Sequence, residues 1–386
     1  QETGKYCIVY LRQMDNIRLA VRVYQRKLYC TGMRMGGVSM DTDHNQQEMQ
    51  EIWKKFNKQD NGAGGVKPAP KLTPEEEKKR NLKQIGLYLL ITFALTYVVE
   101  IFGIMPMAKN ADAQQAYIVQ SVIASVMFLP ALGALLTRLL TKERLTLRSL
   151  MLTIDLKKNL RYYGLVWFGF DLLILFGAAL YFLIFRDQFD AGMGSMKALF
   201  EAQGLESTQA QVQQVVVVQL AMGAVIAPFA NLLNCFGEEW GWRGFLLPRM
   251  MKQFKVVPAV LLSGVIWGLW HLPLTVIGHN YGVDYVGYPF TGILAMCLFC
   301  TVMGIILSYV TIKTKSCIPA VMGHSTLNGF ASAGILFTSP ERPYNVFLGP
   351  APTGLIGGAG FIAVAGILLY LLYREEKEAV TKWELT

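Results

Sequence analysis

Glu238-Glu239-Trp240-Gly241-Trp242-Arg243 is a polar cluster inside an apolar stretch, and two more follow it: Trp267-Gly268-Leu269-Trp270-His271 and His324-Ser325-Thr326-Leu327-Asn328. Acids, arginine, histidines and asparagine are costly at membrane depth, and they persist there when they pair with one another or take part in chemistry. A glutamate can take a proton from water, and imidazoles can bind a metal or polarise a ligand. The sequence therefore indicates a polar intramembrane site, provided that the three clusters meet.

The composition is that of a membrane protein. Hydrophobic residues make up 53% of the chain and charged residues 16%, which is less charge than a soluble domain of this length usually carries. The apolar residues are grouped into runs of about 20, the length that crosses roughly 30 Å of hydrocarbon. We predict an all-α, polytopic membrane protein with about eight transmembrane helices that enclose the polar site.

The predicted spans cover 85–105, 117–137, 161–185, 222–247, 257–277, 289–312, 317–337 and 354–373. Lys and Arg are concentrated in every second loop, whereas loops 106–116, 278–288 and 338–353 are poor in them. The positive-inside rule then places both termini in the cytoplasm. The same distribution indicates that the net charge of +9 reflects membrane orientation, so we expect the lipid bilayer as a partner and no nucleic acid.

We divide the chain into three parts. Residues 1–80 form a basic, largely flexible, cytoplasmic segment, residues 81–373 form the eight-helix domain, and residues 374–386 form a cytoplasmic tail. Within the first part, 47–59 fits either a membrane-surface helix or a loosely ordered tail. Met40 is a candidate natural start, because the residues before it are what a ribosome-binding site and spacer would give if translated in frame.

The three clusters lie at similar depths. Glu238 and His324 are each about nine or ten residues from the expected inner surface, on the order of 15 Å at the rise of an α-helix. Glu239 and Arg243 are four apart and share a helix face, so we expect them to pair. Glu238 then points elsewhere, and we expect it to lie within about one water of His271 and His324.

Each cluster can also have a purely structural role. The Glu239–Arg243 pair can be a simple ion pair, and His271, or His324 with Asn328, can bond one helix to the next. Outside the clusters we expect structural roles: a packing acid at Asp171, a solvent-facing His279, and packed thiols at Cys297 and Cys300.

The triple pattern resembles the CAAX protease and bacteriocin-processing family, also called CPBP or Abi proteins. The resemblance rests on Glu238-Glu239-x-x-x-Arg243, Trp267-x-x-x-His271 and His324-x-x-x-Asn328, and it covers about residues 85–373. It departs from the family pattern at Trp267, where phenylalanine is common.

The resemblance implies an intramembrane endopeptidase that forms no acyl-enzyme. Glu238 would be the general base, and Arg243 would hold Glu239. His271 and His324 would position the water, directly or through a metal, and Asn328 would donate to the oxyanion. Zinc or another divalent metal would be held by Glu238, His271 and His324. No His-Glu-x-x-His motif is present.

The substrate implied is a membrane-associated peptide or protein, of the CAAX type or from bacterial peptide maturation or immunity. The compact loops favour a bacterial plasma membrane. Two rival functions stay open. One is a non-proteolytic peptide- or ion-binding protein, such as an immunity protein or a transporter, because buried acids and histidines also mark ion pathways. The other is a scaffold whose clusters only lock helices together.

Overall fold

The structure, a computed structural model, describes residues 73–109, 113–143 and 145–384. The predictions for residues 1–72, including the flexible segment, the surface helix over 47–59 and the start at Met40, lie outside the described residues. The described part consists of helices and turns, with one isolated bridge between Ser339 and Arg342. The all-α class is therefore confirmed.

The long helices are α3 (Pro74–Val99), α7 (Leu156–Ile184), α15 (Phe290–Thr314) and α17 (Ala359–Glu384). Helices of intermediate length are α5 (Ala113–Val126), α6 (Leu129–Leu140), α8 (Gly194–Ala202), α9 (Gln209–Val225), α11 (Leu232–Gly241), α13 (Val256–Trp270) and α16 (Ile318–Phe330). Short ones are α4 (Met105–Lys109), α10 (Ala227–Ala230), α12 (Leu247–Met250) and α14 (Leu272–Val276). Two π-helices, η1 (Glu100–Ile104) and η3 (Trp242–Leu246), and two 3-10 turns, η2 (Arg186–Gln188) and η4 (Ile335–Phe337), complete the order.

Four helical stretches of the described residues are long and apolar enough to cross a membrane: Glu75–Lys109, Ile118–Leu140, Leu156–Ile184 and Phe290–Thr314. They correspond to the first, second, third and sixth predicted spans. Val256–Trp270, within the fifth, is a shorter apolar helix. The polytopic membrane class is thus confirmed, while the count of eight stays a prediction.

Local sequence signals explain where many helices start. Thr73 caps α3 through a reciprocal pair with Glu76, and Thr208 caps α9 in the same way with Gln211. Proline occupies the first or second position of α6, α10, α12, α14 and α16, where its missing N–H costs no hydrogen bond. The fourth predicted span, 222–247, is consequently divided: α9 reaches Val225, and Pro228 opens a new short helix.

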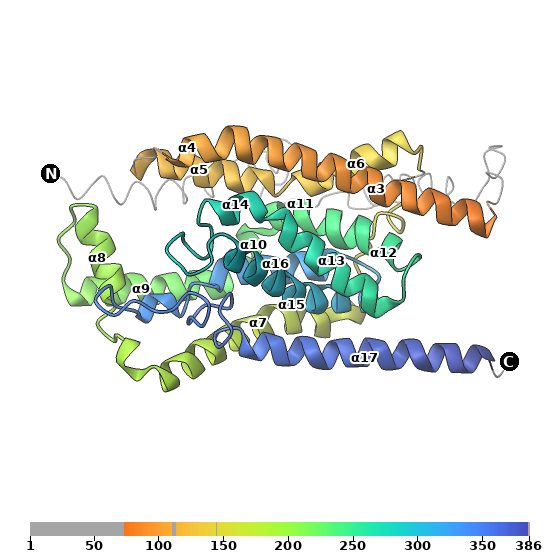
Figure 1. The fold of residues 1–386 in the computed structure, drawn as a ribbon. Coiled ribbons are helices and arrows are strands. Elements are labelled where there is room, and N and C mark those ends of the chain that lie inside the picture. The colour runs from red at the N-terminus through yellow and green to blue at the C-terminus, as the bar shows by residue number, and fades with distance from the viewer. Residues whose placement is uncertain (1–72, 110–112, 144, 385–386) are drawn as a thin grey trace, which may run out of the picture. The chain divides into compact units, whose positions relative to one another are not determined.

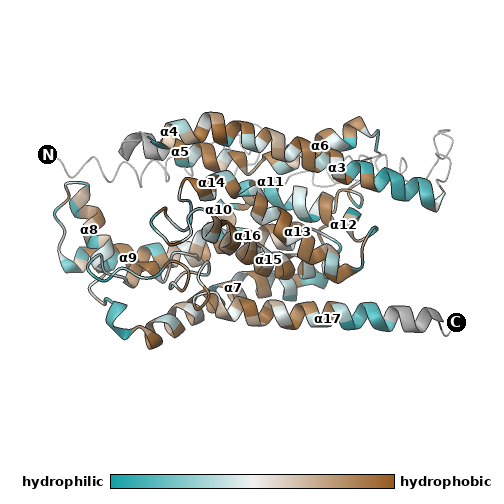
Figure 2. Ribbon diagram, viewed as in Figure 1, coloured by the Kyte–Doolittle hydropathy of each residue, from teal (hydrophilic) through white to brown (hydrophobic). Residues whose placement is uncertain are grey.

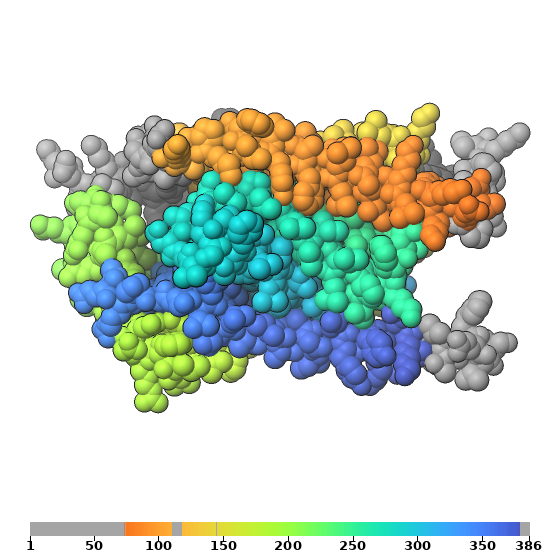
Figure 3. Space-filling view, in the orientation of Figure 1, coloured from red at the N-terminus to blue at the C-terminus, as the bar shows by residue number. Residues whose placement is uncertain are grey.

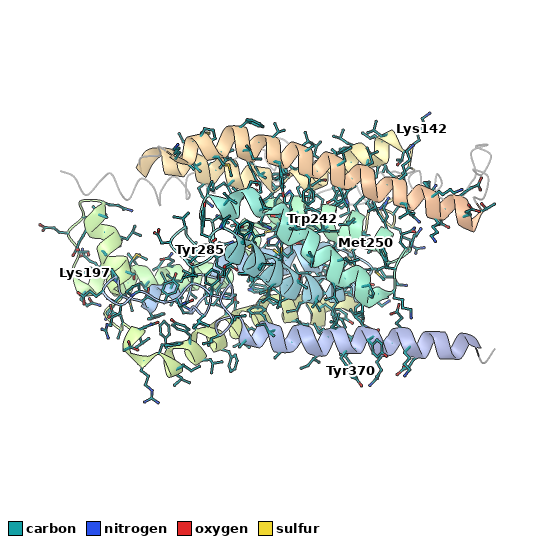
Figure 4. The ribbon with its side chains drawn as sticks, in the orientation of Figure 1. Lys142, Lys197, Trp242, Met250, Tyr285 and Tyr370 are labelled. Atoms are coloured by element: carbon teal, nitrogen blue, oxygen red, sulfur yellow. The ribbon has the colours of Figure 1, made fainter. Side chains whose placement is uncertain are left out.

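The helices of the described domain form layers (Figure 1). The α3 helix packs on α6, and α6 packs on α11, so these elements cover one side of the central helices. The opposite side is covered by α7, which packs on α16, and by α17, which packs on α15. Between these covers, α15 packs on α13 and α16, and α16 packs on α11. In the space-filling view, elements from the middle of the chain lie between α3 and α17 (Figure 3). Trp242, fully buried, lies at this centre, whereas Tyr370 of α17 points outward (Figure 4).

Polar residues gather at the ends of the long helices. The start of α3 and the part of α17 at 374–378 are hydrophilic and lie at the same end, while the middle of each helix is apolar (Figure 2). At that end Lys252 bonds Glu77 at 2.8 Å, and Lys313 pairs with Glu375. Loops predicted on the other side also meet, because the Tyr281 hydroxyl donates to the Thr353 carbonyl at 3.3 Å. These contacts join segments that the sequence places on the same side, and the sides themselves stay a prediction.

Candidate active site

The first cluster lies at the end of α11 and in the π-helix that follows. Glu238 and Glu239 lie in the last turn of α11, and both are buried, 2% and 0% exposed. Gly237 lets α11 approach the turn before α6 closely, because a Cβ there would lie 2.4 Å from the Met127 carbonyl oxygen. The close approach seals the acids between helices, where each must find a partner.

Glu239 is the more heavily engaged of the two acids. Its Oε1 accepts from Arg243 Nη1 at 2.9 Å, as the four-residue spacing predicts, and lies 2.9 Å from His324 Nδ1. The Arg243 guanidinium also lies 4.3 Å from the centre of the Trp267 ring. Glu239 thereby joins α11, η3 and α16 into one charged unit.

Glu238 has a different partner. Its Oε2 accepts a hydrogen bond from Trp267 Nε1 at 2.7 Å. Glu238 also interacts electrostatically with His324. The two neighbouring acids therefore differ in their hydrogen-bond donors, and the bond from the indole uses only Oε2 of Glu238.

His271 lies where α13 ends and α14 begins. Its Nδ1 is 2.9 Å from the Trp267 carbonyl oxygen, which places the ring proton on Nδ1 and leaves the lone pair on Nε2. The ring is half-buried and packs edge-on against Trp270, with centroids 4.8 Å apart. Cys300 Sγ lies 3.8 Å from Nδ1, so this thiol, predicted as packing, touches the site. His271 and His324 interact electrostatically.

Asn328 lies one turn after His324 on α16. The residue is exposed, unlike the acids, and its amide nitrogen is 3.7 Å from Cys235 Sγ. Side chains four apart on a helix share a face. The amide therefore belongs to the same face of α16 as the imidazole, with N–H groups not committed to a strong acceptor.

Trp267 contacts residues of all three clusters. It bonds Glu238, lies under Arg243, packs edge-on against His324 at 5.3 Å and supplies the carbonyl for His271. The structure thus brings Glu238, Glu239, Arg243, His271 and His324 together around one indole. The departure from the commoner phenylalanine gives Glu238 an N–H donor that phenylalanine lacks.

A fourth wall, on α3, was missed by the sequence reasoning. Tyr88, Thr92, Thr96 and Glu100 recur every four residues, and each is fully buried. Thr96 Oγ1 accepts from Trp270 Nε1 at 2.8 Å, which ties this wall to the residue before His271. The signal was available, because four polar residues at helical spacing in an apolar span mark one face.

The residues expected to hold a metal have suitable donor types. Each imidazole has its Nδ1 engaged by an oxygen, the arrangement that usually leaves Nε2 for a ligand. Among the described residues, however, no three His, Cys, Asp or Glu side chains are grouped so that they could hold a metal ion. Zinc stays a prediction, and no step below passes through a metal.

The remaining predictions for single residues vary in outcome. Asp171 is buried with Oδ1 unpartnered among the described residues, and its role as a local packing acid stays a prediction. His279, expected to face solvent, is instead half-buried, because the turn that carries it folds back on α14 through its backbone N–H to the Leu274 carbonyl.

Comparison with known proteins matches the part of the chain that holds all three clusters. Residues 217–330 match the family described as "Type II CAAX prenyl endopeptidase Rce1-like". A curated relative, CAAX prenyl protease 2 of Methanococcus maripaludis, is 32% identical over 101 residues. The aligned part covers 26% of this chain and 37% of the relative, so the match spans little more than a third of that protein.

Proposed function

We propose that the chain is an intramembrane endopeptidase, because residues 217–330, which hold all three clusters, match the Rce1-like family of type II CAAX prenyl endopeptidases. It would cleave a membrane-associated peptide or protein with a water molecule activated by Glu238. The observation that carries the proposal is the division of labour between the two acids. Glu239 is committed to Arg243 and His324, whereas Glu238 receives the Trp267 N–H on one oxygen.

The proposed reaction uses the chain's own groups. Glu238 takes a proton from water, the water oxygen attacks the carbonyl carbon, and the carbon–nitrogen bond breaks. The proton then passes from Glu238 to the leaving nitrogen, so the sum is the addition of one water. Asn328 donates an N–H to the oxygen that gains negative charge, a contribution that can exceed 10²-fold in rate, by rough analogy with other side-chain amides. His271 and His324 orient the water through Nε2.

Arg243, Glu239 and Trp267 act as supports in this proposal. The ion pair and the cation over the indole fix the end of α11 against α13, so the Glu238 carboxyl keeps its direction. A site that holds its groups before the substrate arrives lowers the barrier without reorganisation in the transition state.

A metal would be held by Glu238, His271 and His324, and would supply Lewis acidity toward the water and the carbonyl. Elemental analysis of the purified protein, with cleavage measured before and after chelation, tests this part alone. The substrate class is also proposed: a lipid-modified CAAX terminus, as the relative's name indicates for that protein, or a bacterial peptide of maturation or immunity.

Mass spectrometry of membrane peptides tests the function class. Cells that express the wild-type chain and cells that express Glu238→Gln are compared, with Asp171→Asn as a matched buried-acid control. We expect cleavage products that depend on the wild type, vanish with Glu238→Gln and persist with Asp171→Asn. Identical peptide sets in all three cultures would contradict a protease and favour a binding, transport or scaffold role.

A further inference from the structure

Glu100 is a buried acid that the proposed reaction does not use. It is 0% exposed and forms the first residue of the π-helix η1, at the end of the polar face of α3. Insertions of this kind recur at functional sites, because they widen the helix and redirect side chains. An ionisable residue at membrane depth is a candidate functional residue for the same reason that it is costly.

The carboxyl group of Glu100 lacks a partner. Among the described residues, neither Oε1 nor Oε2 has a hydrogen-bond partner. The two buried acids of the site do have hydrogen-bond donors: Glu238 accepts from Trp267, and Glu239 accepts from Arg243. Buried polar groups are nearly always satisfied, so a carboxyl with both oxygens unused requires an explanation.

Three observations place Glu100 beside the site. Thr96, one turn earlier on the same face, accepts a hydrogen bond from Trp270, whose ring packs on His271. The π-helix η1 packs against α14, which begins directly after His271. Glu100 and Glu238 interact electrostatically through the buried interior.

The charges around the site do not balance. Three acids, Glu100, Glu238 and Glu239, face one arginine, Arg243, among the described residues of these elements. The other buried arginines, Arg138 and Arg249, pair with Glu143 elsewhere. Even if His324 carries a proton beside Glu239, one acid stays without a counter-charge, and it must either bind a proton or meet a cation. A site with surplus acid in a medium of low dielectric favours a cation from the ligand.

We propose that Glu100 is a specificity-determining residue that binds a cationic side chain of the substrate, the ammonium of Lys or the guanidinium of Arg, close to the cleaved bond. The inference rests on the proposed function. A charged donor would satisfy both carboxyl oxygens and offset the surplus acid. A substrate without the cation would leave Glu100 unsatisfied, and such sites discriminate strongly against the analogue that lacks the donor.

The test uses the full-length purified protein in lipid nanodiscs and a membrane peptide that it cleaves. Lys is compared with norleucine, which has a similar chain without the ammonium, at each position near the cleaved bond. At one position we expect the Lys peptide to have a kcat/KM at least about tenfold higher, the equivalent of roughly 1.4 kcal/mol. In Glu100→Gln that ratio should fall to about one, with the norleucine peptide cleaved at close to the wild-type rate.

Asp171→Asn is the matched control, because it neutralises another buried acid, one on α7, and it should keep the Lys preference. Glu100→Asp serves if Glu100→Gln does not fold, and its ratio should be intermediate. The proposal is overturned if the wild type prefers Lys at no position, if either Glu100 variant keeps the full preference, or if Glu100→Gln slows both peptides equally. Failure of the wild type to cleave any membrane peptide would instead refute the proposed function, and cleavage by Glu238→Gln would refute only the role of Glu238 as its base.

Discussion

At the scale of single residues, the site depends on how two adjacent acids are separated. Glu239 is hydrogen-bonded to Arg243 and His324, while Glu238 accepts a hydrogen bond from the indole N–H of Trp267 on another helix. Spacing along one helix was enough to predict the Glu239–Arg243 pair. The partners across helices, Trp267 for Glu238 and Glu239 for His324, were not predictable, because the sequence pattern of one helix does not fix how its neighbour is rotated.

Glu239→Gln should damage stability more than Glu238→Gln does. The amide can keep a hydrogen bond, but it leaves the buried Arg243 without its counter-charge, and breaking a buried pair costs about 3–5 kcal/mol. We expect a clearly lower midpoint of thermal unfolding in detergent for Glu239→Gln, and a near wild-type midpoint for Glu238→Gln. Equal midpoints for the wild type and Glu239→Gln would show that the pair does not hold the fold.

At the scale of elements, glycine and proline shape the helices that carry the site. The sequence alone does not show that Gly237 packs against Met127 and Gly241 against Pro130. It did not predict the two π-helices or the early end of α16 at Phe330, because those depend on tertiary packing around Arg243 and Phe330 more than on local propensity.

Gly237→Ala tests this packing against Gly86→Ala. A methyl group at residue 237 would lie 2.4 Å from the Met127 carbonyl and 2.8 Å from Phe128 Cα, both backbone atoms. Overpacking of this kind costs about 1–3 kcal/mol. At residue 86 on α3 there is nothing within 4 Å, so alanine should be neutral or stabilise the helix by up to about 1 kcal/mol. Unfolding midpoints that shift alike in both variants would contradict the close contact of α11 with α6.

At the scale of the whole molecule, the charged loops define two ends. Pairs such as Lys252–Glu77 join loops predicted on one side, and Tyr281–Thr353 joins loops predicted on the other. Hydropathy and loop charge predict the same grouping, and the side of the membrane on which each end lies stays a prediction. They could not give the number of crossings, since short helices such as α16 are covered by neighbours and need not cross alone.

The orientation of the two ends is a prediction of its own. In a background with Cys7 and Cys30 replaced by serine, single cysteines at residues 60 and 380 should resist a membrane-impermeant thiol reagent in intact cells. A cysteine at Asp284, exposed in a loop predicted outside, should react. The predicted orientation would be contradicted if the reagent labelled residue 60 or 380 in intact cells, or if residue 284 reacted only after lysis.

The central claim, that Glu238 is the base of a proteolytic site, is tested most directly by the cleavage rate of purified Glu238→Gln on one reporter peptide. The variant keeps the shape of the side chain and its bond from Trp267, but it cannot take the proton. We predict a loss of at least about 10²–10⁴-fold in kcat, the usual worth of general-base assistance, with an unchanged unfolding midpoint. Cleavage by the folded variant at close to the wild-type rate would contradict the account.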